Sequence, residues 1–185
     1  VLIDVKTGKV EKFANLKSHG TPDKWSTYLA YELTPAKEKA DKKAPKAEGK
    51  DDKKKPAPKK DNKALIVMNV KTAQTDTIKN VTSYKFNEDG SLLAYVFEPE
   101  KKDSLAKPGL YLYNPTNGEK KVVLEGEKGS KFKTPSFSEV GTMAFYANTD
   151  TAKAAKKNID IYFYDIKAGE VKKAAYNQME GLQEG

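Results

Sequence analysis

Apolar and polar positions in this chain alternate in short runs that repeat, and the clearest unit is residues 84–97, YKFNEDGSLLAYVF. Two apolar runs flank an Asp-Gly pair, which is a strong hairpin signal because glycine tolerates the positive φ of a tight turn. The unit recurs at residues 134–147, TPSFSEVGTMAFYA, where Gly141 takes the place of Gly90. A looser copy at residues 22–33 lacks the turn glycine. The pattern therefore predicts repeated β-hairpins.

A second hairpin alternates with the first. Each copy is an apolar strand that ends in Asp or Asn, a turn with a small residue four positions later, and a second strand. The four turns pair Asp4 with Gly8, Asn69 with Ala73, Asn114 with Gly118, and Asp165 with Gly169. The copies start roughly 45 to 65 residues apart, a repeat length typical of propellers and solenoids. Four strands per repeat, joined by hairpins, form a propeller blade. We therefore predict an all-β chain, a partial β-propeller of four-stranded antiparallel blades.

The whole chain, residues 1–185, is expected to be one propeller segment. Its predicted parts are a half blade at 1–13, a connector at 15–24, an interrupted blade at 24–81, a blade at 84–125, a last blade at 133–176, and the start of a further element at 177–185. Roughly three and a half blades cannot close a ring of four to eight. Val1 already lies inside a strand pattern, so we expect the sequence to be part of a longer propeller.

Residues 35–63 interrupt one blade with twelve lysines, six acidic residues and almost nothing apolar beyond alanine. Such a segment cannot bury enough surface to offset the roughly 1–2 kcal/mol per residue that ordering costs, so it is expected to be disordered and to add little stability. It carries six of the eight net positive charges, so the basic character of the chain belongs to this insert. The acids among the lysines favour a solvated spacer over a surface for lipid or nucleic acid.

Composition excludes several classes of function. Cysteine is absent, which excludes disulfides and thiolate metal sites. Every basic side chain other than the single histidine is lysine. Arginine supplies most bidentate contacts with phosphate and guanine, so a chain without it is a poor candidate for specific recognition of nucleic acid. No apolar run approaches the length of about 18 residues that a membrane-spanning helix needs.

Candidate catalytic and metal-binding residues are few. His19 is the only histidine, and we expect a solvated loop residue rather than a base. Residues 87–90 resemble part of a calcium loop, but Lys85 stands where that motif needs an acid. Ser91 and Ser138 have the setting of turn residues, and the G-x-S-x-G turn of a nucleophilic serine occurs nowhere. We predict no catalytic, cofactor-binding or metal-binding residue in this chain.

Tyrosines recur in the predicted strands, where they could form a stacking surface for bases or sugars. Aromatic side chains in strands more often pack into a core, and we favour that interpretation. The residues concerned are Tyr84, Tyr95, Tyr111, Tyr113, Tyr146, Tyr162 and Tyr164.

The repeated hairpins and the order of the segments both resemble those of a known family. The FNEDGSLLAY and FSEVGTMAFY hairpins, alternating with pairs of the LYLYNPTNGE type, resemble the WD-like repeats of TolB-type and prolyl oligopeptidase-type propellers. The order of TPDKWSTYLAYEL, a lysine-rich insert and LIVMNVKTAQTDTI resembles the N-terminal propeller of secreted bacterial prolyl oligopeptidase-family serine peptidases. The resemblance covers nearly the whole chain.

This resemblance implies a non-catalytic propeller that gates the access of short peptides to an α/β-hydrolase domain of the same parent chain. It also implies a periplasmic or secreted location and a parent protein that is a serine peptidase. Two other functions remain open: a TolB-like propeller module that binds a protein or ligand without enzymatic activity, and a basic adhesion segment acting through the lysine-rich insert. Because open sheet edges are templates for pairing, we also expect self-association through the blade edges.

Overall fold

The structure is a computed structural model that describes residues 1–3, 5–24, 27–34, 64–100, 103, 105–149 and 159–174. These ranges contain strands and no helix, which confirms the all-β prediction. The strands are β1 (Leu2–Ile3), β2 (Val10–Glu11), β3 (Leu16–Gly20), β4 (Tyr28–Leu33), β5 (Ala64–Asn69), β6 (Thr75–Lys79), β7 (Val81–Phe86), β8 (Leu93–Phe97), β9 (Gly109–Tyr113), β10 (Lys120–Glu125), β11 (Lys131–Phe132), β12 (Ser136–Phe137), β13 (Thr142–Asn148), β14 (Asp160–Asp165) and β15 (Glu170–Lys173).

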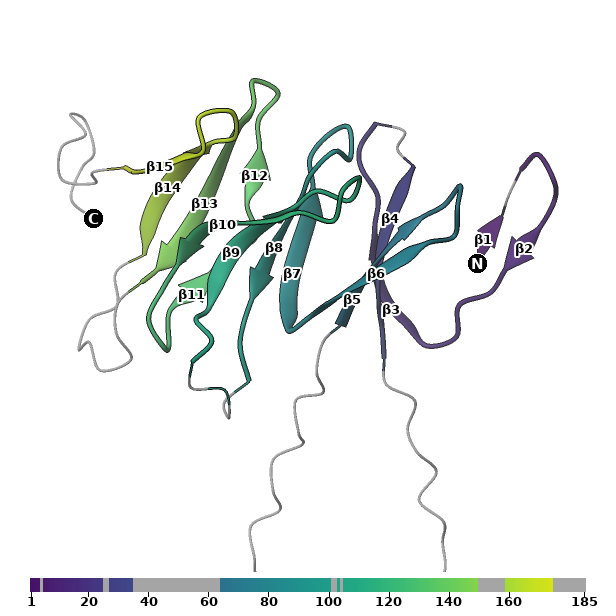
Figure 1. Cartoon of the computed structure of the whole chain (residues 1–185), viewed down its shortest axis with the longest axis horizontal. Coiled ribbons are helices and arrows are strands. Elements are labelled where there is room, and N and C mark those ends of the chain that lie inside the picture. The colour runs from purple at the N-terminus through teal and green to yellow at the C-terminus, as the bar shows by residue number, and fades with distance from the viewer. Residues whose placement is uncertain are drawn as a thin grey trace, which may run out of the picture.

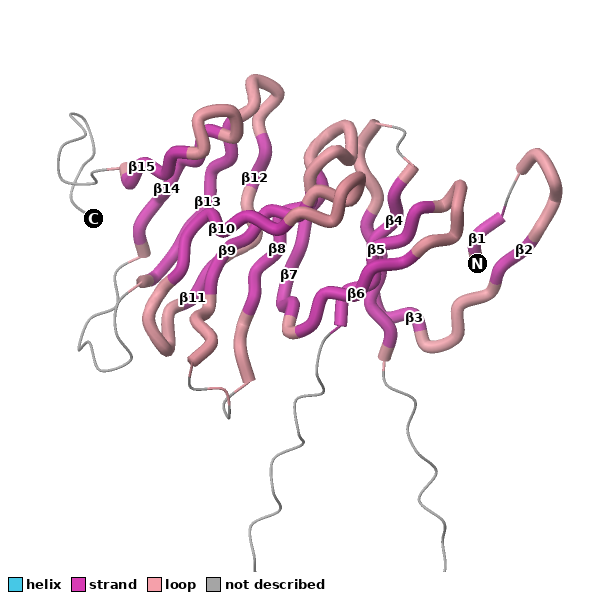
Figure 2. The backbone as a smooth tube through the Cα atoms, viewed as in Figure 1, coloured by secondary structure: helices cyan, strands magenta, loops and turns pink. Residues whose placement is uncertain are grey.

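The strands form successive antiparallel sheets that lie side by side (Figure 1). After the β1–β2 hairpin, the first sheet has the order β3-β4-β5-β6 and the second the order β7-β8-β9-β10, as seen in the backbone trace of Figure 2. In the third sheet β11 and β12 both pair with β13, followed by β14 and β15, so the innermost strand is split in two. Each sheet is a meander in chain order, as expected of propeller blades.

The region expected to be a connector, residues 15–24, contains a strand instead. Residues 16–20 form β3 and pair with β4, with a bulge between Leu16 and Ser18. The sequence LKSHG lacks the apolar run that marks the other strands, and no residue of β3 is fully buried. The prediction of a connector was therefore wrong, and β3–β4 is the counterpart of the β7–β8 hairpin.

The repeated Asx turns have the geometry that their spacing predicts. The amide of the small residue donates to the carbonyl of the Asp or Asn four positions earlier: Ala73 to Asn69 at 2.8 Å and Gly118 to Asn114 at 2.9 Å. Gly118 has a φ of 75° and Ala73 a φ of 57°, so the alanine adopts a left-handed conformation that suits glycine better. Asp4 lies outside the described residues.

The core lies between the sheets, because alternate residues of each middle strand face opposite neighbours. Leu93 and Tyr95 of β8 belong to a buried cluster shared with the first sheet. Ala94 and Val96 belong to a second cluster shared with the third sheet. Each seam between blades is therefore a small hydrophobic core, and a sheet is stabilised by the blade on either side.

The connections between second and third strands leave from one edge of the assembly. The ends of β4, β8 and β13 lie along the lower edge in Figure 1, opposite the hairpin turns. The lysine-rich insert at 35–63 and residues 177–185 lie outside the described residues.

Candidate functional site

An open groove of about 450 Å³ lies at the seam between β3 and β7, the first and edge strands of the first two sheets. Consecutive residues of both strands line it, 18–21 and 82–86, so backbone edges as well as side chains border the space. Among the described residues each of the two strands pairs with one neighbour only. Their remaining backbone N–H and C=O groups are available to an extended ligand.

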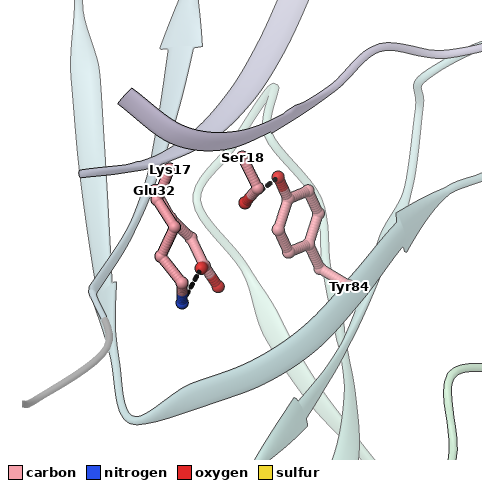
Figure 3. A network of polar contacts seen from close by, with 4 residues as sticks. All are labelled: Lys17, Ser18, Glu32 and Tyr84. Carbon is pink, nitrogen blue, oxygen red and sulfur yellow. Dashed lines mark hydrogen bonds and ion pairs between the residues drawn. The ribbon is translucent and has the colours of Figure 1, made fainter. Parts of the chain in front are cut away.

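Tyr84 forms one wall of the groove and ties the two blades together. Its ring lies against Gly20, where an added Cβ would be 3.0 Å from the ring. Its hydroxyl is 3.3 Å from the Ser18 Oγ of the other blade, as drawn in Figure 3. Burial raises the pKa of Tyr84, while the hydrogen bond with Ser18 works in the opposite direction. The phenol therefore stays neutral at physiological pH and acts as a hydrogen-bonding group.

Glu32 supplies a buried carboxylate beside this pair. It is 6% exposed, and its Oε2 accepts a hydrogen bond from Lys17 Nζ at 2.7 Å (Figure 3). A buried charge needs a partner of opposite sign, because desolvation without one is costly. Lys17 itself is partly exposed, so the ion pair has one buried member, Glu32, and one member in contact with solvent. The network of Lys17, Glu32, Ser18 and Tyr84 offers donors and acceptors for a polar ligand.

A second link closes the same seam beyond the groove. The backbone N–H of Lys24 donates to the carbonyl of Glu88 at 2.8 Å, and the two side chains form an ion pair at 2.9 Å. The hydrogen bond and charge of Glu88 raise the pKa of Lys24. The exposed ion pair contributes little, because solvent and salt screen it. The backbone hydrogen bond is not screened in this way and links the two hairpins.

His19 lies in β3 rather than in the expected loop, and it is exposed as expected. Its strand position is opposite Tyr31 of β4. His19 lines the groove together with Ser18, but the Ser18 hydroxyl contacts the Tyr84 hydroxyl and makes no hydrogen bond to the imidazole. Adjacent serine and histidine residues in this strand therefore do not form a nucleophile–base pair.

The serines at the hairpin turns have local partners. Asn87 Nδ2 donates to Ser91 Oγ at 2.9 Å. The Ser138 hydroxyl is 2.6 Å from the Thr142 hydroxyl. These contacts are those of turn residues, and neither partner can act as a general base at neutral pH.

Most of the strand tyrosines pack into the core, as predicted. Tyr95, Tyr113, Tyr162 and Tyr164 are buried. Tyr95 also stacks on Tyr111 with ring centroids 5.5 Å apart, within the range of favourable aromatic pairs. Tyr84 and Tyr111 are partly buried, and Tyr146 is 52% exposed. The tyrosines therefore do not share one stacking surface.

The described part of the chain contains no group of three or more His, Cys, Asp or Glu side chains placed to hold a metal ion. It also contains no helix long and apolar enough to cross a membrane.

Sequence reasoning missed Ser18, Gly20 and Glu32. Ser18 and Tyr84 are 66 residues apart in the chain, so their contact follows only from the stacking of two blades. Glu32 did give a signal, an acid inside the apolar run YLAYEL. An acid in a buried strand implies a nearby cation, which here is Lys17.

No protein-family model matches the chain, and no curated protein matches its sequence. Solved structures do match its fold. The β-propeller domain of the Trilobed protease from Pyrococcus furiosus superposes with a TM-score of 0.56 at 18% identity, covering 88% of this chain and 43% of that one. The acylaminoacyl peptidase of Pyrococcus horikoshii gives a TM-score of 0.54 at 14% identity, covering 88% of this chain and 25% of that one.

A structure from a study of two prolyl endopeptidases gives a TM-score of 0.51 at 12% identity, covering 91% of this chain and 21% of that one. These solved neighbours are β-propeller domains of prolyl oligopeptidase-family peptidases. The chain spans less than half the length of each of them. At these identities the similarity establishes the fold, a β-propeller, and the described sheets are its blades.

Proposed function

We propose that this chain is the non-catalytic propeller segment of a secreted or periplasmic serine peptidase of the prolyl oligopeptidase family. In this proposal it gates the access of short peptides to an α/β-hydrolase domain that lies outside the chain. The observation that carries the proposal is the similarity of its blades to the propellers of three peptidases. The absence of a G-x-S-x-G turn from the sequence agrees with a catalytic serine elsewhere.

The groove between β3 and β7 suits this role. It lies on the innermost strands, which border the central channel of a propeller. Free strand edges can bind an extended peptide through backbone hydrogen bonds, with little dependence on its side chains. The neutral Tyr84 hydroxyl and the Lys17–Glu32 pair add polar contacts at the same place. A gate for varied short peptides needs weak binding of this kind.

Peptide length is the property that a gate controls, and it can be measured on the full-length natural protein. A series of fluorogenic peptides with the same cleavage site and four to about forty residues should show kcat/KM falling steeply above a limiting length. The matched variant is Tyr84→Phe in the full-length protein, which retains the ring against Gly20 and removes the hydroxyl. It should change KM for peptides short enough to pass and leave the length limit in place.

Two results would contradict the proposal. Equal kcat/KM for the shortest and longest peptides would remove the gating role. Absence of peptidase activity from the full-length protein would instead favour the TolB-like binding module.

A further inference from the structure

The two seams between blades place a tyrosine at the same position but give it neighbours of opposite charge. Tyr113 precedes Asn114 at the end of β9, and Tyr164 holds the same position at the end of β14. Each is 1% exposed. The outer strand of the preceding blade supplies the neighbour, which is Asp76 in β6 at the first seam and Lys121 in β10 at the second.

At the first seam the tyrosine is satisfied. The Tyr113 hydroxyl donates a hydrogen bond to the Asp76 carboxylate. At the second seam the Tyr164 hydroxyl is buried and has no hydrogen-bond partner, while the Lys121 ammonium lies 5.8 Å from the centroid of its ring. A buried hydroxyl without a partner is uncommon and costs free energy, so it points to a missing acceptor.

The Tyr164 hydroxyl and the Lys121 ammonium converge on Gly169. A Cβ added to this glycine would lie 2.6 Å from Lys121 Nζ and 3.8 Å from Tyr164 Oη. The φ of +71° favours glycine there, and the lack of a side chain leaves the two donors near one another. At Gly118, the equivalent turn of the second blade, an added Cβ meets nothing within 4 Å. In the described part of the chain no carboxylate pairs with Lys121.

We propose that Lys121 and Tyr164 form a binding site for a carboxylate at the rim of the second seam. A phenol O–H and an ammonium are both donors, and a carboxylate between them would accept a charge-assisted hydrogen bond from each. The contact between Tyr113 and Asp76 shows, in the same protein, that a carboxylate fits against the tyrosine at this position. Lys121 is exposed, so its flexible side chain can move aside and admit the ligand. This site is separate from the groove and does not depend on the proposed peptidase role.

The test is an NMR titration of the isotope-labelled 185-residue chain with acetate, replacing chloride at constant ionic strength. The amide of Gly169 should shift in a saturable way. Lys121→Met should weaken acetate binding by about tenfold, the equivalent of losing one charge-assisted contact. Tyr164→Phe should weaken it by a smaller factor. Lys120→Met, at the neighbouring exposed lysine, is the matched control and should leave the titration unchanged.

Lys121→Asp provides an independent readout, because it places a carboxylate of the chain itself where Asp76 stands at the first seam. It should abolish the acetate response and raise the midpoint of thermal unfolding. Capped Gly-Glu-Gly and Gly-Gln-Gly peptides identify the source of the ligand. If the Glu peptide binds and the Gln peptide does not, the ligand is an acidic side chain of a protein or peptide. If acetate binds and neither peptide does, the ligand is a small free acid. A linear shift of equal size in wild type and Lys121→Met would overturn the proposal, as would equal binding of both peptides.

Discussion

The Tyr113 hydroxyl on β9 donates a hydrogen bond to the Asp76 carboxylate on β6, across the seam between the first two blades. Burial raises the pKa of Tyr113, and the hydrogen bond and charge of Asp76 raise it further, so the phenol remains the donor at all physiological pH values. Tyr164 holds the equivalent place at the next seam without an acceptor. Two tyrosines of equal burial therefore contribute differently to stability.

Replacing each tyrosine by phenylalanine should separate these contributions. Tyr113→Phe removes a hydrogen bond to an exposed carboxylate and should lower the free energy of unfolding by about 1–2 kcal/mol. Tyr164→Phe removes a buried hydroxyl that has no partner and should be neutral or slightly stabilising. Urea unfolding followed by circular dichroism measures both. Equal losses in the two variants would show that the hydroxyls have equivalent surroundings in solution.

Ala73 should be a point at which the chain can be stabilised. Its φ of 57° places an alanine in the conformation that glycine holds in the other described turns of this type. Ala73→Gly should raise the free energy of unfolding by roughly 0.5–1 kcal/mol, because relief of the left-handed strain exceeds the extra entropy of an unfolded glycine. Gly118→Ala is the reciprocal control: its added Cβ meets no atom, so a loss of about 1–2 kcal/mol would come from φ alone. A destabilising Ala73→Gly would contradict this assignment.

One face of the third sheet is apolar and exposed, whereas the equivalent face of the second sheet is covered by the third sheet. Phe163 and Tyr146 stand at the register positions of Leu112 and Val96, which are each 4% exposed against the third sheet. Phe163 is 46% exposed and Tyr146 52%. We expect the 185-residue chain to self-associate through this face, in addition to any pairing of open strand edges.

Sedimentation velocity over a range of concentrations measures this association. Phe163→Glu should shift the population toward monomer, since it places a charge in the contact face. Val140→Glu, at an exposed turn residue, is the control and should leave the association unchanged. A wild-type chain that stays monomeric at high concentration would exclude the prediction.

Stability should fall at alkaline pH. Burial raises the pKa of Tyr95 from 10.0 to about 12, so the native state holds this phenol proton more tightly than the unfolded chain does. The stability that this group contributes is fully present below pH 10 and is lost as the pH rises from 10 through 12. The slope for one such group approaches about 1.4 kcal/mol per pH unit. Urea unfolding at pH 8, 10 and 11 should show the loss, and Tyr95→Phe should reduce its slope. An unchanged slope in that variant would place the alkaline transition elsewhere.

Local patterns in the sequence were sufficient to predict the hairpins. Asn69 and Asn114, each followed four residues later by a small residue, mark turns whose backbone and side-chain hydrogen bonds are local. The prediction held even where Ala73 replaces glycine, since the Asx side chain stabilises the turn. Strand β3 was missed because it is the edge strand of its sheet and none of its residues is fully buried. Its sequence therefore lacks the apolar pattern by which a buried strand is recognised.

The groove and the tyrosine pairs could not be predicted in the same way. Gly20 meets Tyr84, and Tyr113 meets Asp76, only after two blades stack. Such contacts depend on the angle and distance between sheets, which no short-range pattern encodes. The unpaired Tyr164 has the same local sequence setting as Tyr113 and differs only in its neighbour from the preceding blade.

The most direct test of the proposed function is the labelling of the full-length natural protein with a fluorophosphonate probe, followed by mass spectrometry of the labelled peptide. Such probes react with a serine that a base activates and an oxyanion site supports. We expect stoichiometric labelling on one serine outside this 185-residue sequence, and none of the isolated chain. Labelling of Ser91, Ser136 or Ser138 would contradict a non-catalytic propeller, and a full-length protein that stays unlabelled would contradict the serine peptidase.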